Sequence, residues 1–487
     1  MVPLLAAWSD GGADDDSTAA PAGPDPQLTD RACEVSPDLG VAVTCHWLIV
    51  PEDRDQPSDG EIRLAVVLLR SRSTDARPDP VVFLAGGPGD SGTDGLEGWA
   101  ESRLLDNRDL VLLDQRGTGV SQPVLECPER EEAVVRNLGR DEGYEEELGD
   151  YRRAIGQCWR RLVRDGVDLD AYDTEASAAD VADLRVALGV DEWNLYGVSY
   201  GTRLALATMR SHPEGIRSVV LDSVYPTTVG GLARLGAAAD RSFAALFDGC
   251  DADPACSEAY PDLEATFGSV VDRFNETPFE GTVDLGEPFG VVPLAITGDD
   301  IVAGLFDALY DTDLIPLLPS IGADLQEGET GAIPAIAQQG IPFLNDAAEG
   351  TYLSVDCADS GRLGARRNRE LLDRPGDKAG LFVYASDAFC ADWDVEPLPR
   401  AFNRPVRSRI PALVIAGTYD PVTPPGDSKA AARALKNATY VEFDGWGHAV
   451  TDTDEDCPLA IRQAFLDDPA AVLDTSCAGA FEPSFDV

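Results

Sequence analysis

Short runs of mostly hydrophobic residues recur along the chain, and within them hydrophobic and polar residues do not alternate. Runs of about 4–8 such residues are typical of strands that are buried on both faces of a parallel sheet. The runs that fit this description are 80–84, 110–113, 193–196, 218–221, 412–416 and 439–443. They predict a mostly parallel sheet.

Two β-branched runs precede this series. They cover 41–51 and 62–70, and the polar segment 52–60 separates them, which predicts a hairpin near the N-terminus. Amphipathic helical segments at 176–188 and 202–212 lie between later runs. Strands that alternate with helices in this way indicate a doubly wound α/β sheet.

The region 226–405 interrupts this alternation. It is rich in Pro and Gly, has helical patterns such as 237–247 and 301–310, and contains no clear buried strand. We interpret it as a mostly helical cap over the C-terminal edge of the sheet, where ligands bind in open α/β sheets. The expected organisation is a signal remnant and disordered linker at 1–32, the first part of the core at 33–225, the cap at 226–405 and the second part of the core at 406–487.

The motif Gly197-Val198-Ser199-Tyr200-Gly201 stands between a predicted strand and a predicted helix. It fits the pattern G-x-S-x-G, in which a sharp turn holds a serine hydroxyl clear of the sheet at the N-terminus of a helix. The structural alternative is a glycine-rich packing turn. The flanking strand and helix favour the catalytic interpretation, so we predict that Ser199 is a nucleophile.

A serine nucleophile needs a neighbouring base. The chain has three histidines, of which His46 falls in an early strand and His212 follows a helix. His448 instead lies in a glycine-rich loop just after a late strand. Because the chain order serine, acid, histidine is that of α/β-hydrolases, we predict that His448 is the base.

The third member of such a triad is an acid that orients the imidazole. Asp420 follows the strand 412–416 and precedes His448 by one helix and one strand. Asp222 is the alternative, because it ends the strand 218–221 and some α/β-hydrolases place the acid there. We predict that Asp420 is the acid and that Asp222 hydrogen-bonds a turn.

An oxyanion hole needs two backbone N–H donors. We expect one from Tyr200 and the other from Gly87, in the glycine-rich segment 86–89, because glycine lets the backbone approach a substrate closely. A simple turn is the alternative for this segment. Asp114 and Arg116 follow another strand at the same edge and are expected to brace the active-site loops.

The net charge is −49, from 87 acidic and 38 basic side chains. Phosphate backbones would be repelled, so we expect no nucleic-acid partner.

The ten cysteines contain no C-x-x-C pair, and with three histidines the usual zinc spacings are absent, so we expect no metal and no cofactor. An even number of cysteines indicates disulfides and an oxidising compartment. The simplest connectivity pairs neighbours in order: Cys33–Cys45, Cys127–Cys158, Cys250–Cys256, Cys357–Cys390 and Cys457–Cys477.

The first residues indicate export from a bacterial cell. Residues 3–10 look like the tail of a signal peptide, and 5–7 resemble a lipoprotein signal except that Trp8 stands where the lipidated cysteine would be. The segment 11–27 has the composition of a disordered tether. We therefore expect a secreted or cell-envelope protein. Separately, we expect a monomer. A lipid anchor in the native precursor and an ordinary ragged N-terminus both stay open.

Taken together, these motifs resemble the prolyl- and tripeptidyl-aminopeptidase branch of the α/β-hydrolases, and exported actinobacterial tripeptidyl aminopeptidases above all. The resemblance spans about 40–460 and departs from many relatives at Ala85, where they carry His. It rests on the segments 86–89, 114–119, 197–201, 420–424 and 447–448.

The resemblance implies that the protein cleaves short peptides from a free N-terminus, which requires an anionic site for the substrate ammonium. Acidic residues flank Cys357 and Cys390, and from them we select Asp359 as the ammonium partner. The carboxylates in question are Asp356, Asp359, Asp392 and Asp394. The leading hypothesis is thus an exported serine aminopeptidase. A serine esterase or lipase-like enzyme with the same triad, and a catalytically silent binding protein on this fold, are the alternatives.

Overall fold

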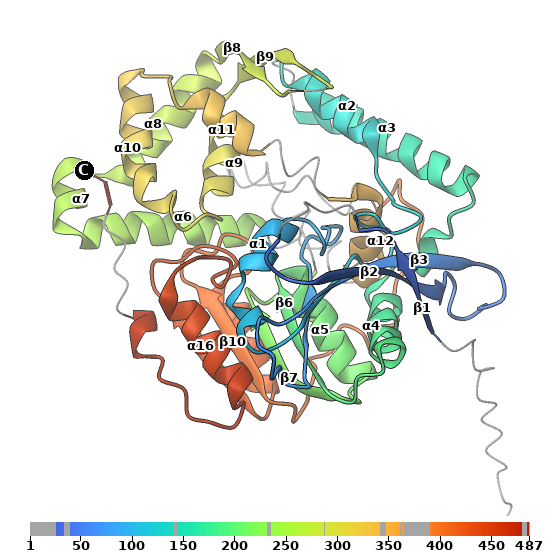
Figure 1. The fold of residues 1–487 in the computed structure, drawn as a ribbon. Coiled ribbons are helices and arrows are strands. Elements are labelled where there is room, and N and C mark those ends of the chain that lie inside the picture. The colour runs from blue at the N-terminus through green and yellow to red at the C-terminus, as the bar shows by residue number, and fades with distance from the viewer. Residues whose placement is uncertain are drawn as a thin grey trace, which may run out of the picture.

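The computed structural model describes residues 26–33, 39–140, 144–230, 235–286, 288–340, 347–360, 363, 390–479 and 485–486. Its central sheet has nine strands in the order β1-β2-β3-β5-β4-β6-β7-β10-β11 (Figure 1). The strands are β1 (Gln27–Arg31), β2 (Val43–Pro51), β3 (Glu61–Leu69), β4 (Val81–Leu84), β5 (Leu110–Leu113), β6 (Trp193–Val198), β7 (Ile216–Asp222), β10 (Ala412–Gly417) and β11 (Ala438–Phe443).

The first strands pair antiparallel, from β1 through β2 and β3 to β5, and all pairs from β5 to β11 are parallel. This is the predicted α/β-hydrolase sheet with its N-terminal hairpin. The inner parallel strands are buried on both faces, as β10 shows, whereas the edge strand β11 is only partly buried. Ala412 and Val414 join the core on one side of the sheet, while Leu413 and Ile415 join the core on the other.

Helices cover both faces of the sheet. The first core contains hydrophobic residues of α4 (Thr174–Leu188), α5 (Tyr200–Ser211) and α15 (Pro425–Ala434). The second contains residues of the short helix η1 (Arg103–Asp106) and of α16 (Asp456–Asp467). A consequence is that the carboxyl ends of the parallel strands stay clear of these helices, and Figure 1 shows the cap on that side.

The cap has its own hydrophobic core, which Tyr419 and Phe485 from the C-terminal part of the chain also enter. The described part of the cap is mostly helical, as predicted, but it also contains a two-stranded antiparallel sheet. The elements are α6 (Leu235–Ala252), α7 (Pro254–Ala259), α8 (Leu263–Glu276), β8 (Phe279–Asp284), β9 (Val291–Ile296), α9 (Gly298–Ala308), α10 (Leu318–Glu327), α11 (Ile333–Gly340) and α12 (Glu349–Ser360).

Two helices from the first part of the chain lie beside the cap. These are α2 (Pro128–Asn137) and α3 (Tyr144–Arg164), and the N–H of Ala295 in β9 donates to the carbonyl of Leu138 just after α2 (2.7 Å). Figure 1 shows both helices next to β8 and β9. The structure thus builds the cap side from 128–164 as well as from the region after β7.

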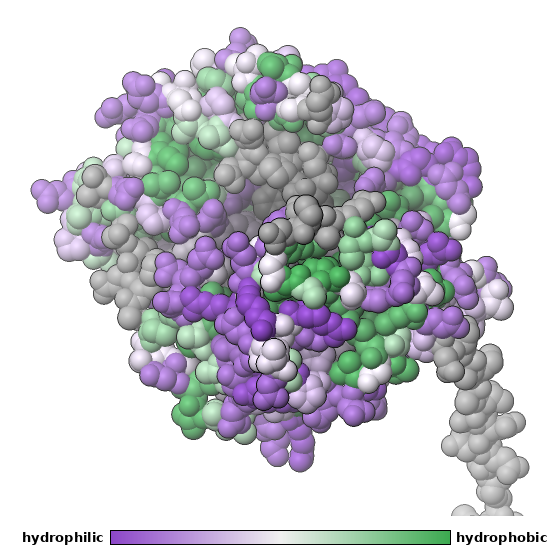
Figure 2. Space-filling model, in the orientation of Figure 1, coloured by the Kyte–Doolittle hydropathy of each residue, from purple (hydrophilic) through white to green (hydrophobic). Residues whose placement is uncertain are grey.

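The structure contains five disulfides, and they join the neighbouring cysteines that we paired from chain order. Two of them, Cys127–Cys158 and Cys357–Cys390, lie in one hydrophobic cluster that joins α3 to α12. Within the described residues, no helix is long and apolar enough to cross a membrane. Figure 2 shows hydrophilic side chains over much of the visible face, which accords with the large net charge.

Candidate active site

Ser199 sits at a sharp turn between β6 and α5. Its backbone has φ 55° and ψ −123°, a conformation that non-glycine residues rarely adopt. The flanking glycines make the turn possible. A Cβ on Gly197 would lie 2.4 Å from the carbonyl oxygen of Gly201, and a Cβ on Gly201 would lie 1.9 Å from the carbonyl oxygen of Leu84. Strand and helix therefore approach too closely for any side chain at these two positions.

The glycine-rich segment after β4 packs directly against this turn. A Cβ on Gly86 would lie 3.3 Å from the Cβ of Ser199, and Gly87 has φ 91°, in the region that favours glycine. Tyr200 is the first residue of α5, so its N–H has no acceptor within the helix. The Tyr200 N–H thus directly follows Ser199 without a partner in the helix, and the glycine-rich segment that contains Gly87 packs against the Ser199 side chain through Gly86.

Asp420 and His448 are joined by a direct interaction. Asp420 Oδ2 lies 2.9 Å from His448 Nδ1, and the carboxylate also accepts from the hydroxyl and N–H of Thr423. Asp420 is fully buried. Burial alone would raise the pKa of its carboxyl, but the charge and hydrogen bond of His448 hold that pKa below its ordinary value. An ionised carboxylate therefore faces the imidazole.

The end of β7 brings the serine turn and the histidine loop together. The N–H of Ser199 donates to the carbonyl oxygen of Asp222 (3.0 Å), and the N–H of Ala449 donates to the hydroxyl of Ser223 (2.9 Å). The Asp222 carboxylate accepts from both N–H and hydroxyl of Thr451, so it holds the loop that follows His448. In this arrangement Asp420, and not Asp222, contacts Nδ1.

The other two histidines lie elsewhere. His46 is on β2, where its Nδ1 lies 3.1 Å from Asp30 on the neighbouring edge strand β1. His212 is the C-terminal cap residue of α5. Neither is placed at the serine turn.

The cap contributes residues that the sequence did not point to. The carbonyl oxygen of Tyr310, just after α9, accepts from the N–H of His448 (2.9 Å), and their rings lie edge to face at 5.1 Å. Asp307 shares that end of α9, and burial raises the pKa of its carboxyl to about 7. Within the described residues, its carboxylate has no hydrogen bond or ion pair.

Asp90 is a second unforeseen carboxylate near the base. It follows the glycine-rich segment, and its Oδ2 lies 3.1 Å from the point where a Cβ on Gly86 would be. Burial alone would lower the pKa of His448, but the charge and hydrogen bond of Asp420, with the charges of Asp222 and Asp90, raise it above its ordinary value of 6.5.

We expect kcat/KM to rise with pH and to level off above an apparent pKa that is higher than 6.5. The reason is that only the neutral imidazole can take the serine proton, and the free enzyme sets the pH dependence of kcat/KM. A p-nitrophenyl ester is the substrate to use, because it does not titrate. Asp90→Asn removes one negative charge and is expected to lower the apparent pKa. An apparent pKa below 6.5 in the native protein would contradict this electrostatic account.

The loop after β5 braces the site through two fully buried side chains, Asp114 and Arg116. Asp114 accepts from Ser91 Oγ (2.8 Å) and from the N–H groups of Thr93 and Val120 (both 2.9 Å). Arg116 pairs with Asp180 on α4 through two hydrogen bonds, of 2.7 and 2.8 Å. The two residues therefore fasten the loops around the glycine-rich segment to the core.

Asp359 is not offered to a ligand. It is 1% exposed, and its Oδ2 accepts from the Thr174 hydroxyl (2.6 Å) and from Arg203 (3.3 Å). Burial raises the pKa of its carboxyl to about 7, and the charge of Arg203 opposes that shift. We therefore withdraw Asp359 as the ammonium partner. The sequence placed it correctly near the disulfide but could not show which way its side chain faces.

One of the other acidic residues considered with Asp359 lies near it: Asp356, one turn earlier on α12, interacts with Arg203 and Tyr225 as Asp359 does. Asp392 pairs with Arg152 on α3 (2.6 Å), Asp394 is exposed, and Asp356 lies 3.4 Å from the Tyr225 hydroxyl. Among the described residues, no group of three or more His, Cys, Asp or Glu side chains could hold a metal ion.

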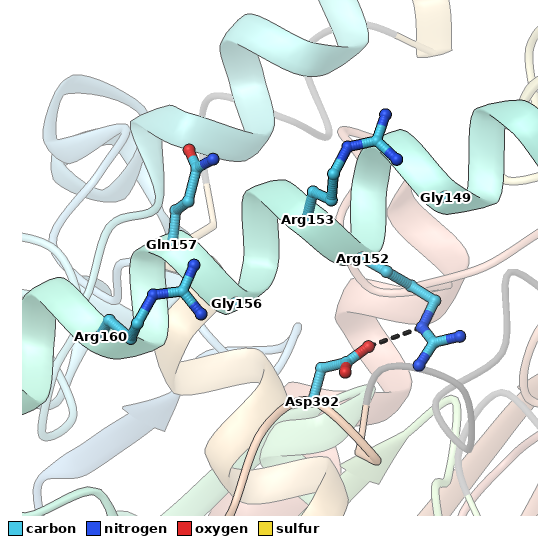
Figure 3. Close-up of a pocket in the computed structure, with 7 residues that line it drawn as sticks. All are labelled: Gly149, Arg152, Arg153, Gly156, Gln157, Arg160 and Asp392. Carbon is cyan, nitrogen blue, oxygen red and sulfur yellow. Dashed lines mark hydrogen bonds and ion pairs between the residues drawn. The ribbon is translucent and has the colours of Figure 1, made fainter.

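A groove of about 510 Å³ runs along α3, apart from these residues. Its lining includes Arg152, Arg153 and Arg160, with Asp392 opposite Arg152 (Figure 3). Gly149 and Gly156 each lie one helical turn before an arginine whose guanidinium approaches them. None of the lining residues belongs to the serine, histidine or acid positions, so we do not assign the groove to catalysis.

Comparison with known proteins supports the fold. Residues 79–255 match the model of the alpha/beta hydrolase fold, and 378–477 match the model of TAP-like protein. Serine protease Hip1 of Mycobacterium tuberculosis is 27% identical, over 87% of this chain and 84% of that protein. Carboxylesterase B of the same species is 28% identical, over 89% and 86%. Tripeptidyl aminopeptidase of Streptomyces lividans is 25% identical, over 87% and 81%. These matches confirm the predicted fold and the predicted resemblance.

Proposed function

Because this chain is a serine hydrolase of the α/β-hydrolase fold with a TAP-like C-terminal part, we propose that it is an aminopeptidase that releases short peptides or residues from free N-termini. The observation that carries the proposal is the buried Asp420–His448 pair beside the Ser199 turn. Relatives named serine protease and tripeptidyl aminopeptidase support peptides as the substrate class.

The reaction follows from the placement of these groups. Ser199 Oγ attacks the scissile carbonyl carbon while His448 Nε2 takes the hydroxyl proton, and Asp420 stabilises the imidazolium. The N–H groups of Tyr200 and Gly87 bind the oxyanion. His448 then gives its proton to the leaving amine, the C–N bond breaks, and an ester to Ser199 remains. Water attacks this ester with His448 as base again, and the N-terminal fragment leaves as an acid.

Recognition of a free N-terminus needs an anion near the acyl part of the substrate. Asp307 supports this role, since its carboxylate is largely buried and is without a hydrogen bond or ion pair in the described part of the chain. Tyr310, whose ring touches the imidazole, lies three residues further along. The ring of Tyr310 contacts the imidazole, and the helix rise per residue separates Tyr310 from Asp307. Added together, these lengths place Asp307 on the order of 10 Å from the base. An extended tripeptide spans about the same length.

We expect peptides with a free N-terminus to be cleaved about 10–100 times faster than their N-acetylated forms. The estimate follows from a charge-assisted hydrogen bond of about 1.5–3 kcal/mol to the ammonium. Asp307→Asn should remove most of this preference, measured as the ratio of kcat/KM for the two peptides. Asp313→Asn, at an exposed carboxylate of the same region, is the control that should keep the preference. Equal cleavage of free and blocked peptides by the native protein would contradict the exopeptidase proposal.

A serine esterase with the same residues is the second candidate. The relative named carboxylesterase B, at 28% identity, favours it specifically. Peptide amides and p-nitrophenyl esters assayed side by side separate the two functions, since turnover of esters alone would defeat the peptidase proposal.

We also infer an extracytoplasmic location, because disulfides form and persist mainly in oxidising compartments and this protein has five.

A further inference from the structure

A series of hydrogen-bonded, buried polar groups connects α5, the helix that follows Ser199, with the cap. The hydroxyl of Tyr200 lies 2.9 Å from Thr174 Oγ1, and Thr174 Oγ1 lies 2.6 Å from Asp359 Oδ2. All three residues are at most 1% exposed. They come from three different elements, since Tyr200 begins α5, Thr174 begins α4, and Asp359 lies in the last turn of α12.

The direction of these hydrogen bonds follows from the groups around Asp359. Its carboxylate faces only donors: the Thr174 hydroxyl, the Thr174 N–H (3.4 Å) and the Arg203 guanidinium (3.3 Å). A hydroxyl has one proton to donate. Thr174 therefore donates to Asp359 and accepts from Tyr200. Burial and the Asp359 charge raise the pKa of the Tyr200 hydroxyl well above its ordinary value, which keeps it a donor.

Arg203 holds Asp359, at the other end of this hydrogen-bonded series. Besides Asp359, its guanidinium donates to the carbonyl of Pro226 (3.0 Å) and lies 3.7 Å from the ring centroid of Tyr225. Both belong to the segment that leaves β7 toward the cap. The Asp359 carboxylate, on the cap helix α12, thus accepts from donors on the two core helices α4 and α5, and Arg203 is itself held by the segment after β7.

The position of Tyr200 matters for catalysis. Its N–H is one of the two proposed oxyanion donors, and such a donor must lie within about 2.7–3.1 Å of the developing charge. Displacements near 1 Å cost on the order of 100-fold in rate. A side chain anchored at its hydroxyl limits how far the first residue of α5 can turn, and with it the N–H.

We propose that Asp359, acting through Thr174, is a positioning residue that holds the Tyr200 N–H in the oxyanion hole, so that the cap helix α12 helps to set the rate of acylation. The inference rests on the proposed function, because it takes Tyr200 as an oxyanion donor. It also gives Asp359 a role in the reaction other than the ammonium contact that the sequence suggested.

The test compares two substitutions at Thr174, which is completely buried. Thr174→Val keeps the shape and removes the hydroxyl, whereas Thr174→Ser keeps the hydroxyl. At alkaline pH, above the Asp359 pKa of about 7, kcat for a p-nitrophenyl ester should fall about tenfold in the valine variant with KM nearly unchanged. This decrease in kcat is smaller than the 10²–10³-fold decrease expected when an oxyanion donor is lost completely. The serine variant should retain most of the activity.

Tyr200→Phe is the second variant, because it removes only the hydroxyl at the other end of the hydrogen bond. It is expected to reproduce the tenfold fall in kcat at an unchanged KM. Thermal unfolding of each variant accompanies the kinetics. If the valine and phenylalanine variants both match the native kcat, the positioning role is wrong while the proposed function stands. If the native protein fails to react with a fluorophosphonate at Ser199, both the positioning role and the proposed function are wrong.

Discussion

Ser199→Ala is expected to lower kcat by about six orders of magnitude for both peptide and ester substrates. Loss of the nucleophile in a serine hydrolase removes nearly all catalysis by the triad, and only binding and the oxyanion hole are left to act. Here the expectation depends on the turn between β6 and α5, which presents the Ser199 side chain to the glycine-rich segment after β4. The measurement is kcat for a peptide amide and a p-nitrophenyl ester under the same conditions.

The same reasoning predicts strong non-additivity with the base. His448→Ala should cost about as much as Ser199→Ala, and the double variant should be no worse, because the two residues act as one unit. Circular dichroism and the melting temperature should be close to those of the native protein in all three variants. A folded Ser199→Ala protein that keeps more than about a hundredth of the native kcat would contradict the assignment.

Asp420→Asn is expected to lower kcat by about 10⁴ while the protein stays folded. An asparagine can still pack in the same space, but it cannot stabilise the imidazolium and it favours the wrong imidazole tautomer. The carboxylate is well placed for the effect, at 2.9 Å from His448 Nδ1 and fully buried. Kinetics on the ester substrate measure the loss, and Asp420→Glu serves as a variant that keeps the charge.

Asp222→Asn is the matched comparison, because Asp222 is also fully buried and is the other acid that the chain order allows. Its carboxylate accepts from the N–H groups of Val450 and Thr451, so an amide NH₂ there would face donors. Each unsatisfied buried group costs about 1–3 kcal/mol, and we expect a lower melting temperature. A drop of 10⁴ in kcat for Asp222→Asn with an unchanged melting temperature, beside an active Asp420→Asn, would reverse the two roles.

The parallel core could be predicted from the sequence because burial on both faces leaves uninterrupted hydrophobic runs. β5 and β10, for example, contain only buried residues. The strands that we did not predict have another pattern. β1, which lies in the segment assigned to the linker, has no buried residue, and β8 and β9 have one and two buried residues, respectively. Edge and cap strands of this kind carry little hydrophobic signal.

The site divides in the same way. The sequence could indicate the triad residues. A motif identifies Ser199, the small number of histidines restricts the base to His448, and the chain order of the triad favours Asp420. It could not indicate Tyr310, Asp307 and Asp90. The ring contact of Tyr310, the burial of Asp307 and the charge of Asp90 near His448 arise only in the folded chain and leave no local pattern. Asp359 shows the limit most clearly. Its place beside Cys357 was correct, yet its side chain faces Thr174 and Arg203.

The central claim is that one hydroxyl, on Ser199, is the nucleophile, and covalent labelling tests it most directly. The folded protein is treated with a fluorophosphonate, and the modified peptide is identified by mass spectrometry. We predict one adduct per chain, on Ser199, and none in the His448→Ala variant. A folded native protein that stays unlabelled, or that carries the adduct on a residue other than Ser199, would contradict the claim.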